Sequence, residues 1–392
     1  MLNKTSIRNL TLLLGSTMTV MAGATIAPAL PEMTLVFQDV PNADFLVKLV
    51  LTIPALLIAI GAPFSGALLD RWGRKPVIIT GLILYGLAGT SGFVFDSLFG
   101  ILVGRALLGL AVAGVMIGFT TLIADYFSGD KRNQFMGYQA GFMGFGGVIF
   151  LLAGGYLADI GWQYPFLIYL FAFVILPGAL FAIDEPDIQA SSNQQSISAE
   201  KVTSPLKIIA LIYVIGFVGM IIFFMVPVQL PFYLTEAGVN NSQVGFVLAM
   251  QALAAAIVSL QYQKIKARFS FVHISSLVFL TIGFGYIVLA ITTNYISVIL
   301  GLLISGIGLG LLMPNLNVWL VSVIPATMRG RAVGGLTMSI FLGQFFSPII
   351  AQPISQQVGL AGVYGLVGGV SLLLAVAFFG AAFNKPPEPV TS

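Results

Sequence analysis

One arginine interrupts a long apolar stretch of the sequence. Arg105 stands seven residues after Leu98 in a run that contains no other charge as far as Ile123. If this run is a membrane helix, Arg105 lies about 10 Å from its start. A charge at that depth is costly unless it is paired or wet, so Arg105 marks a cavity or a functional relay; the alternative is a side chain that extends to the nearby interface. Glu32 is its nearest candidate partner, with an ordinary interfacial carboxylate as the alternative.

A second group of candidate functional residues, made of glycines and charged residues, lies between two apolar runs, at positions 66–76. A glycine allows a neighbouring helix to approach closely, and a carboxylate suits the positive N-terminal end of another helix, here the eleventh span near 332–334. An acid at the end of the fourth span is placed to receive an arginine. We therefore predict a conformational latch; the alternative is a charged anchor that only sets topology. The latch residues are Gly66, Asp70, Arg71, Gly73, Arg74, Lys75, Asp125 and Arg132.

Other kinds of active-site chemistry are absent from the sequence. The chain has no cysteine and one histidine, which excludes thiolate nucleophiles, Cys-bound zinc and His-rich metal centres. A phosphate-binding loop of the Gly-x-x-x-x-Gly-Lys-Ser/Thr type is also lacking. We expect a protein that is not an enzyme, that holds no metal or cofactor, and that draws its energy from a proton gradient.

The elements that must position these residues are membrane helices. The 392 residues are 58% hydrophobic and only 8% charged, a composition that a soluble protein does not have. Apolar runs of spanning length predict an all-α membrane protein with twelve helices in two pseudo-symmetric six-helix bundles. The expected domains are a first bundle over 1–183, a cytoplasmic linker over 184–206, a second bundle over 207–384 and a cytoplasmic tail over 385–392.

The basic residues predict the orientation. Of the 17 lysines and arginines, all except Lys48 and Arg105 fall in segments that face one side, with Lys48 expected in an outer loop. The positive-inside rule then places both termini in the cytoplasm, in a bacterial inner membrane. Because the positive charges are spread over several short segments, the sequence does not predict nucleic-acid binding. No acid is expected deep in the spans, which disfavours strongly cationic substrates.

The two halves of the sequence repeat one another. Glycines lie five and fourteen residues after Arg132, at Gly137 and Gly146, and at the same distances after Arg329, at Gly334 and Gly343. The offset of 329 − 132 = 197 residues is close to half the chain length. Such a duplication is typical of transporters whose substrate site lies between two bundles.

Candidate substrate contacts lie in the seventh and tenth spans and in the eleventh. Aromatic and methionine side chains recur every three or four residues in the seventh span, which favours either an adaptable apolar substrate or simple packing and lipid contact. Buried amides either bind substrate or tie helices together. The candidate cavity residues are Tyr213, Phe217, Met220, Phe224, Gln229, Asn315, Asn317 and Gln344.

Segment 66–76 reads Gly-Ala-Leu-Leu-Asp-Arg-Trp-Gly-Arg-Lys-Pro and resembles the signature loop of the major facilitator superfamily. The fifth span resembles that of the twelve-span drug/proton antiporter branch, although Phe150 and Leu151 replace its Gly-Pro pair. The resemblance implies that Arg105 takes part in proton coupling and that the first, fourth, seventh and tenth helices line the cavity. The expected helix-packing residues are Gly146, Gly154, Gly155, Gly343 and Pro348.

These features together predict a secondary active transporter that works by alternating access and exports small amphiphilic or drug-like compounds, with inward proton flow. The alternative is a carrier for a sugar, organic acid or lipid, by uptake or facilitated diffusion. A membrane sensor or enzyme is the remaining option. The expected partners are a small-molecule substrate and membrane lipid, with the chain acting as a monomer.

Overall fold

The computed structural model describes residues 3–186, 206–325 and 328–383, and within these ranges the regular structure is entirely helical. The linker from 187 to 205 and the tail from 384 to 392 lie outside the described residues. The first half contains α1 (Lys4–Ala24), η1 (Ala27–Ala29), α2 (Leu30–Val36), α3 (Ala43–Trp72), α4 (Arg74–Gly89), α5 (Ser91–Val94), α6 (Leu98–Tyr126), α7 (Gly129–Ile160), η2 (Tyr164–Leu170) and α8 (Phe171–Phe181).

The second half is also built from helices. It contains α9 (Leu206–Glu236), α10 (Asn241–Leu260), α11 (Tyr262–Lys266), α12 (Phe271–Ile291), α13 (Tyr295–Val323) and α14 (Arg329–Phe383). At 55 residues, α14 is two spans in one element, because Gly359 has a non-helical backbone (φ 71°, ψ 173°) where the chain turns back. A positive φ of this kind is accessible to glycine at little cost.

The prediction of a twelve-span helical protein is confirmed. Eleven helices in the described ranges are long and apolar enough to cross a membrane, and the last of them is divided at Gly359 into two. The first span is α1, η1 and α2 together. It breaks after Ala24 because Pro28 and Pro31 have no N–H to continue the α-helical hydrogen bonds.

Several helices begin at polar caps that the sequence supplies. The Ser97 hydroxyl accepts a hydrogen bond from the Gly100 N–H (3.0 Å) at the start of α6. Asn240 and Gln243 form a reciprocal capping box at the start of α10. These side chains satisfy N–H groups that have no partner within the helix, and so fix where each span begins.

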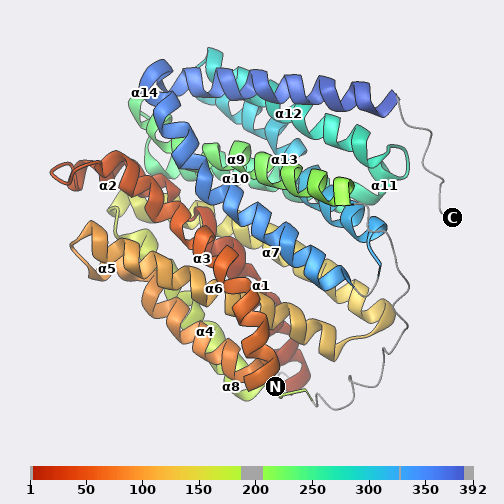
Figure 1. Ribbon diagram of the computed structural model, residues 1–392. Coiled ribbons are helices and arrows are strands. Elements are labelled where there is room, and N and C mark those ends of the chain that lie inside the picture. The colour runs from red at the N-terminus through yellow and green to blue at the C-terminus, as the bar shows by residue number, and fades with distance from the viewer. Residues whose placement is uncertain (1–2, 187–205, 326–327, 384–392) are drawn as a thin grey trace.

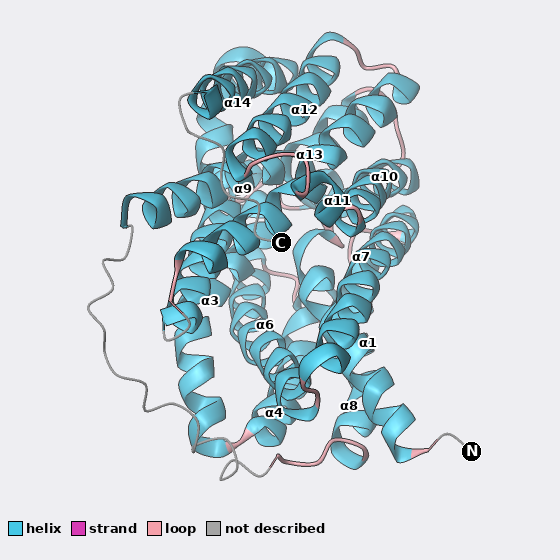
Figure 2. Cartoon of the chain, turned by 90° about the vertical axis from the view of Figure 1, so that its right-hand side faces the viewer, coloured by secondary structure: helices cyan, strands magenta, loops and turns pink. Residues whose placement is uncertain are grey.

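The two halves lie side by side and are arranged about a central space. Figure 1 shows the first half in red to yellow-green beside the second half in green to blue. We call the side on which α1, α4 and α14 begin the terminal face, and the opposite side, on which α3 and α10 begin, the far face. Turned by 90°, α7 of the first half is seen beside α10 of the second half (Figure 2).

Candidate functional site

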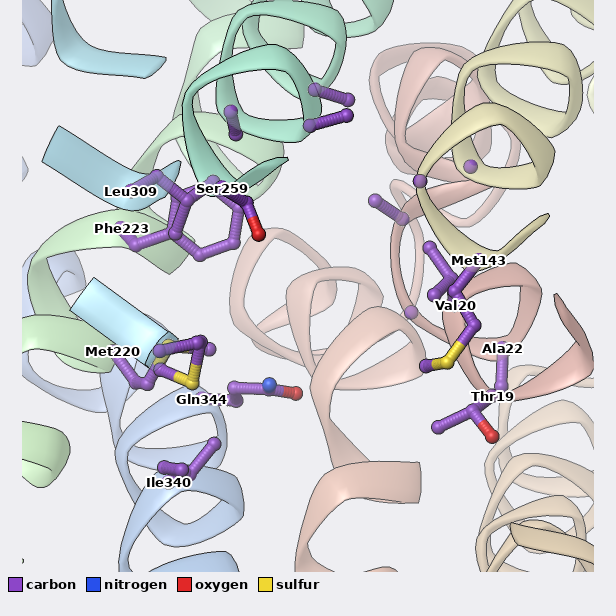
Figure 3. Close-up of a pocket in the computed structure, with 18 of the residues that line it drawn as sticks. Thr19, Val20, Ala22, Met143, Met220, Phe223, Ser259, Leu309, Ile340 and Gln344 are labelled. Carbon is purple, nitrogen blue, oxygen red and sulfur yellow. The ribbon is translucent and has the colours of Figure 1, made fainter. Parts of the chain in front are cut away.

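A cavity of about 450 Å³ lies between the two halves. Its walls come from α1, α3 and α7 of the first half and from α9, α10, α13 and α14 of the second. Figure 3 shows Thr19, Val20 and Met143 on one wall and Met220, Phe223 and Gln344 on the other, with the Gln344 side chain extending into the space between them. A largely apolar pocket with few polar groups is typical of sites for small organic ligands.

Three of the predicted cavity residues line this space, namely Met220, Phe224 and Gln344. Phe223, next to Phe224, also lines it but was not predicted. It lies outside the stripe spaced by three and four residues, so periodicity along one helix did not find it. The other five predicted residues are not among the lining residues in this conformation; they are Tyr213, Phe217, Gln229, Asn315 and Asn317.

Hydrogen bonds explain where most of those five point. The Asn315 amide nitrogen donates to the Phe271 carbonyl (3.0 Å) and to the Ser275 hydroxyl (3.1 Å), which ties α13 to α12. The Asn317 side chain is exposed, and its amide donates to the carbonyl of Met313 in its own helix. Asn315 thus ties two helices together, whereas the Asn317 side chain bonds within its own helix.

The other two aromatic candidates pack between α9 and α14. The Tyr213 hydroxyl donates to the Ala332 carbonyl (2.8 Å), and the ring of Phe217 meets that of Phe346 edge to face at 5.9 Å. Gln229 is fully buried in α9, and neither polar atom of its side chain has a hydrogen-bond partner among the described residues. A buried amide without hydrogen-bond partners is energetically costly.

Arg105 is completely buried in the first half. Its Nε donates to the Val50 carbonyl (2.8 Å), and its Nη2 donates to the Ala22 carbonyl (3.1 Å). The guanidinium carbon lies 5.1 Å from the centre of the Tyr169 ring, while Nη1 has no hydrogen-bond partner within the described ranges. Arg105 is therefore held by backbone carbonyls and an aromatic face, and does not extend to the interface.

Local helix chemistry supplies both carbonyls. Val50 stands four residues before Pro54, which has no N–H to donate to it, so its carbonyl is free to accept from Arg105. Ala22 is in the last turn of α1, where carbonyls also lack helical donors. Helix C-termini carry partial negative charge, which stabilises the nearby cation.

The structure does not bring Glu32 and Arg105 together in an ion pair. Glu32 is half-buried in the first turn of α2, and no carboxylate in the described part of the chain forms an ion pair with Arg105.

The far face of the cavity is closed by contacts between the halves. The Asp159 carboxylate, at the end of α7, accepts hydrogen bonds from the backbone N–H groups of Asn241 (2.9 Å) and Ser242 (3.1 Å) and from the Ser242 hydroxyl. These groups form the N-terminus of α10, whose partial positive charge attracts a carboxylate. Asp159 therefore joins α7 to α10 at the far face.

The predicted packing glycines allow the helices around this contact to meet. A Cβ on Gly155 would lie 2.7 Å from the Asn241 carbonyl oxygen, and one on Gly154 would overlap the carbonyl of Thr25. Further along α7, a Cβ on Gly146 would approach Thr17 at 3.0 Å.

In the second half, the other two packing residues lie where α14 meets α9. A Cβ on Gly343 would overlap the Phe217 carbonyl. Beside Pro348, the Ser347 hydroxyl donates to the Ile221 carbonyl (3.0 Å).

Lys48 is not in an outer loop, and that expectation is wrong. α3 already begins at Ala43, so Lys48 lies in its second turn and is buried, with its side chain between the halves. The ammonium donates to the Gln352 amide oxygen (2.6 Å) and lies 4.8 Å from the centre of the Phe232 ring. This contact joins α3 to α14, on the same face as the Asp159 contact.

The terminal face is open between the halves. A Cβ added to Gly66 of α3, Gly137 of α7 or Gly334 of α14 would meet nothing within 4 Å. Asp70 is exposed, and the described residues give it no hydrogen bond or ion pair; Arg71 and Arg132 are exposed as well. The contact predicted between Asp70 and α14 is therefore not made in this conformation, and the cavity opens toward the terminal face.

Within the first half, the charged loop is held together. Arg74 Nε and Asp125 Oδ2 lie 3.1 Å apart in an ion pair. The Glu185 carboxylate accepts from the backbone N–H groups of Arg74 (2.6 Å) and Lys75 (2.7 Å) and so caps α4. Gly73 fits here because its φ is 92° and a Cβ would lie 2.7 Å from Glu185 Oε1.

Sequence reasoning missed the start of the linker as part of this site. The Asp184 carboxylate pairs with Lys4 at 2.7 Å, and its backbone carbonyl accepts from the Tyr126 hydroxyl. The hydrogen bond from Lys4 lowers the pKa of Asp184 below its usual value. The signal available in the sequence was the pair of acidic residues at 184–185, directly after the sixth span. These acids lie next to basic segments in the structure, although they are far from them along the chain.

Comparison with known proteins gives one family. The family model of the major facilitator superfamily matches residues 12–334 and 212–392. Multidrug resistance protein 1 of Bacillus subtilis is 27% identical over 317 residues, which cover 76% of this chain and 77% of that protein. The bacillibactin exporter of the same organism is 26% identical over 348 residues, covering 82% and 83%.

A solved structure has the same arrangement of helices. A D-xylose-proton symporter superposes with a TM-score of 0.80 over 96% of this chain and 98% of that chain, at 16% sequence identity. At that identity the likeness concerns the fold alone, and it matches the two-bundle fold expected from the sequence.

Proposed function

The chain belongs to the major facilitator superfamily, and from this premise we propose that it is an exporter of small amphiphilic compounds driven by inward proton flow. Members of this family are transporters, and the multi-pass membrane fold agrees with that role. The chain works by alternating access: the two halves rock about the central cavity and expose it first to one face and then to the other.

The observation that carries the proposal is the asymmetry of the cavity. It is sealed at the far face by the Asp159 and Lys48 contacts and open at the terminal face. The distribution of basic residues supports a cytoplasmic terminal face, with both chain termini on that side of a bacterial inner membrane. The described conformation is then the one in which an exporter loads its substrate from the cell interior.

The lining favours amphiphilic export over the alternative of sugar uptake. A sugar needs a hydrogen bond for each hydroxyl that leaves water, since unpaired polar groups are costly to bury. Among the described residues that line this cavity, side-chain hydroxyl or amide groups are found only at Thr19, Thr25, Ser259 and Gln344. The names of the two Bacillus relatives, a multidrug resistance protein and an exporter, also support export.

Proton coupling is assigned to Arg105 and Glu32. Glu32 lies in the helix segment that follows α1, toward the far face, from which protons enter. Arg105 holds the last turn of α1 to α3 through the Ala22 and Val50 carbonyls. A proton shifts the equilibrium between the two conformations only by binding one more tightly than the other, and a carboxylate whose surroundings change when its helix moves meets that condition.

The charged loop at 66–76 acts as the latch of the opposite conformation. When the terminal face closes, Asp70 meets the N-terminus of α14, while Arg74, Asp125 and Glu185 keep the loop in place. The energy source is the proton gradient rather than a nucleotide or cofactor, and the chain functions as a monomer without enzymatic activity.

The test is transport in proteoliposomes with an imposed pH gradient. Pyrenebutanol and pyrenebutanoate serve as probes, and we expect their flux to follow the direction and size of the gradient. Arg105→Ala and Glu32→Gln should lose that response while the protein stays inserted. Asp39→Asn, an exposed carboxylate in the loop before α3, is the matched control and should keep it. Flux that ignores the gradient for every probe contradicts proton coupling, and absence of flux contradicts transport of these compounds.

A further inference from the structure

We infer that the cavity selects amphiphiles with a neutral or anionic head group over those with a cationic one. This inference deepens the proposed export function and rests on the same cavity. It combines three features: the chemistry of the lining, the position of Arg105 behind one wall, and the charges at the open mouth.

The lining contains no counter-charge for a cation. Among the described residues that border the cavity, none is an aspartate, glutamate, lysine, arginine or histidine. The Thr25 hydroxyl already donates to the Met21 carbonyl (2.7 Å), which leaves Thr19, Ser259 and Gln344 as neutral hydrogen-bonding groups. A cation that enters loses its water and gains no carboxylate, and the attraction of phenylalanine rings is weaker than that loss.

A positive charge lies directly behind the wall of the first half. Arg105 donates to the carbonyl of Ala22, a residue that lines the cavity, and to Val50, whose neighbour Leu51 also lines it. Within the described ranges no carboxylate neutralises this guanidinium. Because charges act over longer distances in apolar surroundings than in water, Arg105 raises the potential inside the cavity. That potential attracts an anionic head group and repels a cationic one.

The residues around the opening of the cavity at the terminal face also carry a net positive charge. The first turns of α7 and α14, which lead to lining residues further along the same helices, carry four exposed basic residues and one acid. An excess of positive charge around an opening increases the arrival rate of anions and decreases that of cations. These residues are Lys131, Arg132, Arg329 and Arg331, with Asp130.

The test compares three probes that share one apolar body and differ in head-group charge: pyrenebutanoate, pyrenebutanol and pyrenebutyl-trimethylammonium. Binding to the full chain is measured in nanodiscs of zwitterionic phosphatidylcholine, and empty nanodiscs correct for partition into lipid. We expect the anionic and neutral probes to bind about tenfold or more tightly than the cationic one, a ratio equal to about 1.4 kcal/mol. Equal or tighter binding of the cationic probe overturns the inference.

Two variants locate the preference in the cavity. Gln344→Glu places a carboxylate in the cavity wall. The cationic probe should then bind at least as tightly as pyrenebutanoate, whose own binding should weaken. Gln38→Glu makes the same change of charge at an exposed position before α3 and should leave the order of the three probes unchanged. Retained pyrenebutanol binding by Gln344→Glu shows that the cavity is intact, and an unchanged probe order in that folded variant overturns the inference.

Failure of this inference and failure of the export function are separable. A head-group preference in the binding assay, without flux of any probe across proteoliposomes, supports the inference and contradicts export. Gradient-driven flux of the cationic probe as fast as that of pyrenebutanoate contradicts the inference and leaves export standing.

Discussion

Arg105 owes its position to carbonyl groups that the helices leave without donors. Pro54 frees the Val50 carbonyl, and the end of α1 frees that of Ala22. The guanidinium presents its donors in a fixed planar arrangement, which allows one side chain to hold two helices together. The residue thus has a structural role beside its proposed part in coupling, and the two roles need separate tests.

Arg105→Met should lower the free energy of unfolding by about 2 to 4 kcal/mol, because two buried carbonyls lose their donors. Adding Pro54→Ala to this variant supplies an N–H to the Val50 carbonyl and should recover about 1 kcal/mol. Thermal unfolding in nanodiscs measures both changes. Pro63→Ala, at the other proline inside α3, is the control: its effect should be the same with and without Arg105, whereas that of Pro54→Ala should be about 1 kcal/mol more favourable in Arg105→Met. If the two double variants behave alike, the freed carbonyl is not what holds Arg105.

Lys48 and Gln352 form a buried contact whose two members are not equivalent. Lys48→Met removes the charge, and replacement of a buried charge by an apolar group of similar size is often tolerated. Gln352→Leu leaves the ammonium buried without its acceptor and should weaken far-face closure more, by about 1.5 to 3 kcal/mol. Spin-label distances across the far face measure the shift. A larger shift for Lys48→Met than for Gln352→Leu contradicts this account.

At the scale of elements, the closed far face depends on α7 meeting α10. The Asp159 carboxylate caps the N-terminus of α10 from the other half, and Gly155 lets the two backbones approach. The capping contact is ionic and reversible, whereas the glycine contact depends on shape. A change in the charge of Asp159 therefore alters how firmly the far face closes without altering how the helices fit.

Asp159→Asn should destabilise far-face closure by about 1 kcal/mol, since a neutral amide interacts less with the helix N-terminus than a carboxylate does. The chain has no cysteine, so labels introduced in pairs meet no background sites. Electron spin resonance distances across the far face should show a larger fraction of open molecules. Asp39→Asn, exposed on the same side, should leave the distribution unchanged. An unaltered distribution in Asp159→Asn means that the charge of Asp159 does not hold this face closed.

Sequence predicts elements here better than it predicts contacts between them. Spanning helices follow from length and apolar composition, and those properties belong to each segment by itself. The partners of Lys48 and Asp159 lie 304 and 82 residues away along the chain, so no local pattern indicates them. Lys48 was misplaced because a lone charge near the end of an apolar run is typical of a loop. Glu185 was assigned to a linker because its partners are backbone N–H groups. Almost every residue has such a group, so the sequence does not indicate which of them a carboxylate will cap.

At the scale of the whole molecule, alternating access requires the open terminal face to close, and three glycines on that face have free space beside them. Gly66, Gly137 and Gly334 lie on helices that border the space between the halves, and a side chain on each would meet nothing in this conformation. On the far face, where the halves touch, Gly155 and Gly245 are in close contact. Gly137 and Gly334 are 197 residues apart and so hold equivalent positions in the two halves, which places both of them to form close contacts when the terminal face closes.

Gly334→Trp should therefore fold normally in the described conformation and fail to close the terminal face. We expect export of pyrenebutanoate to fall by more than about tenfold, because blocking closure costs more than 1.4 kcal/mol, while the thermal stability stays near that of the unaltered chain. Labels at Asn133→Cys and Gln263→Cys, exposed on opposite halves, should keep the open distance under all conditions. Gly369→Trp is the matched control, since a side chain there also meets nothing within 4 Å but lies in the second span of α14. Normal export by Gly334→Trp would show that the halves do not close at this glycine, and loss of export in both variants would point to the bulk of tryptophan rather than to its position.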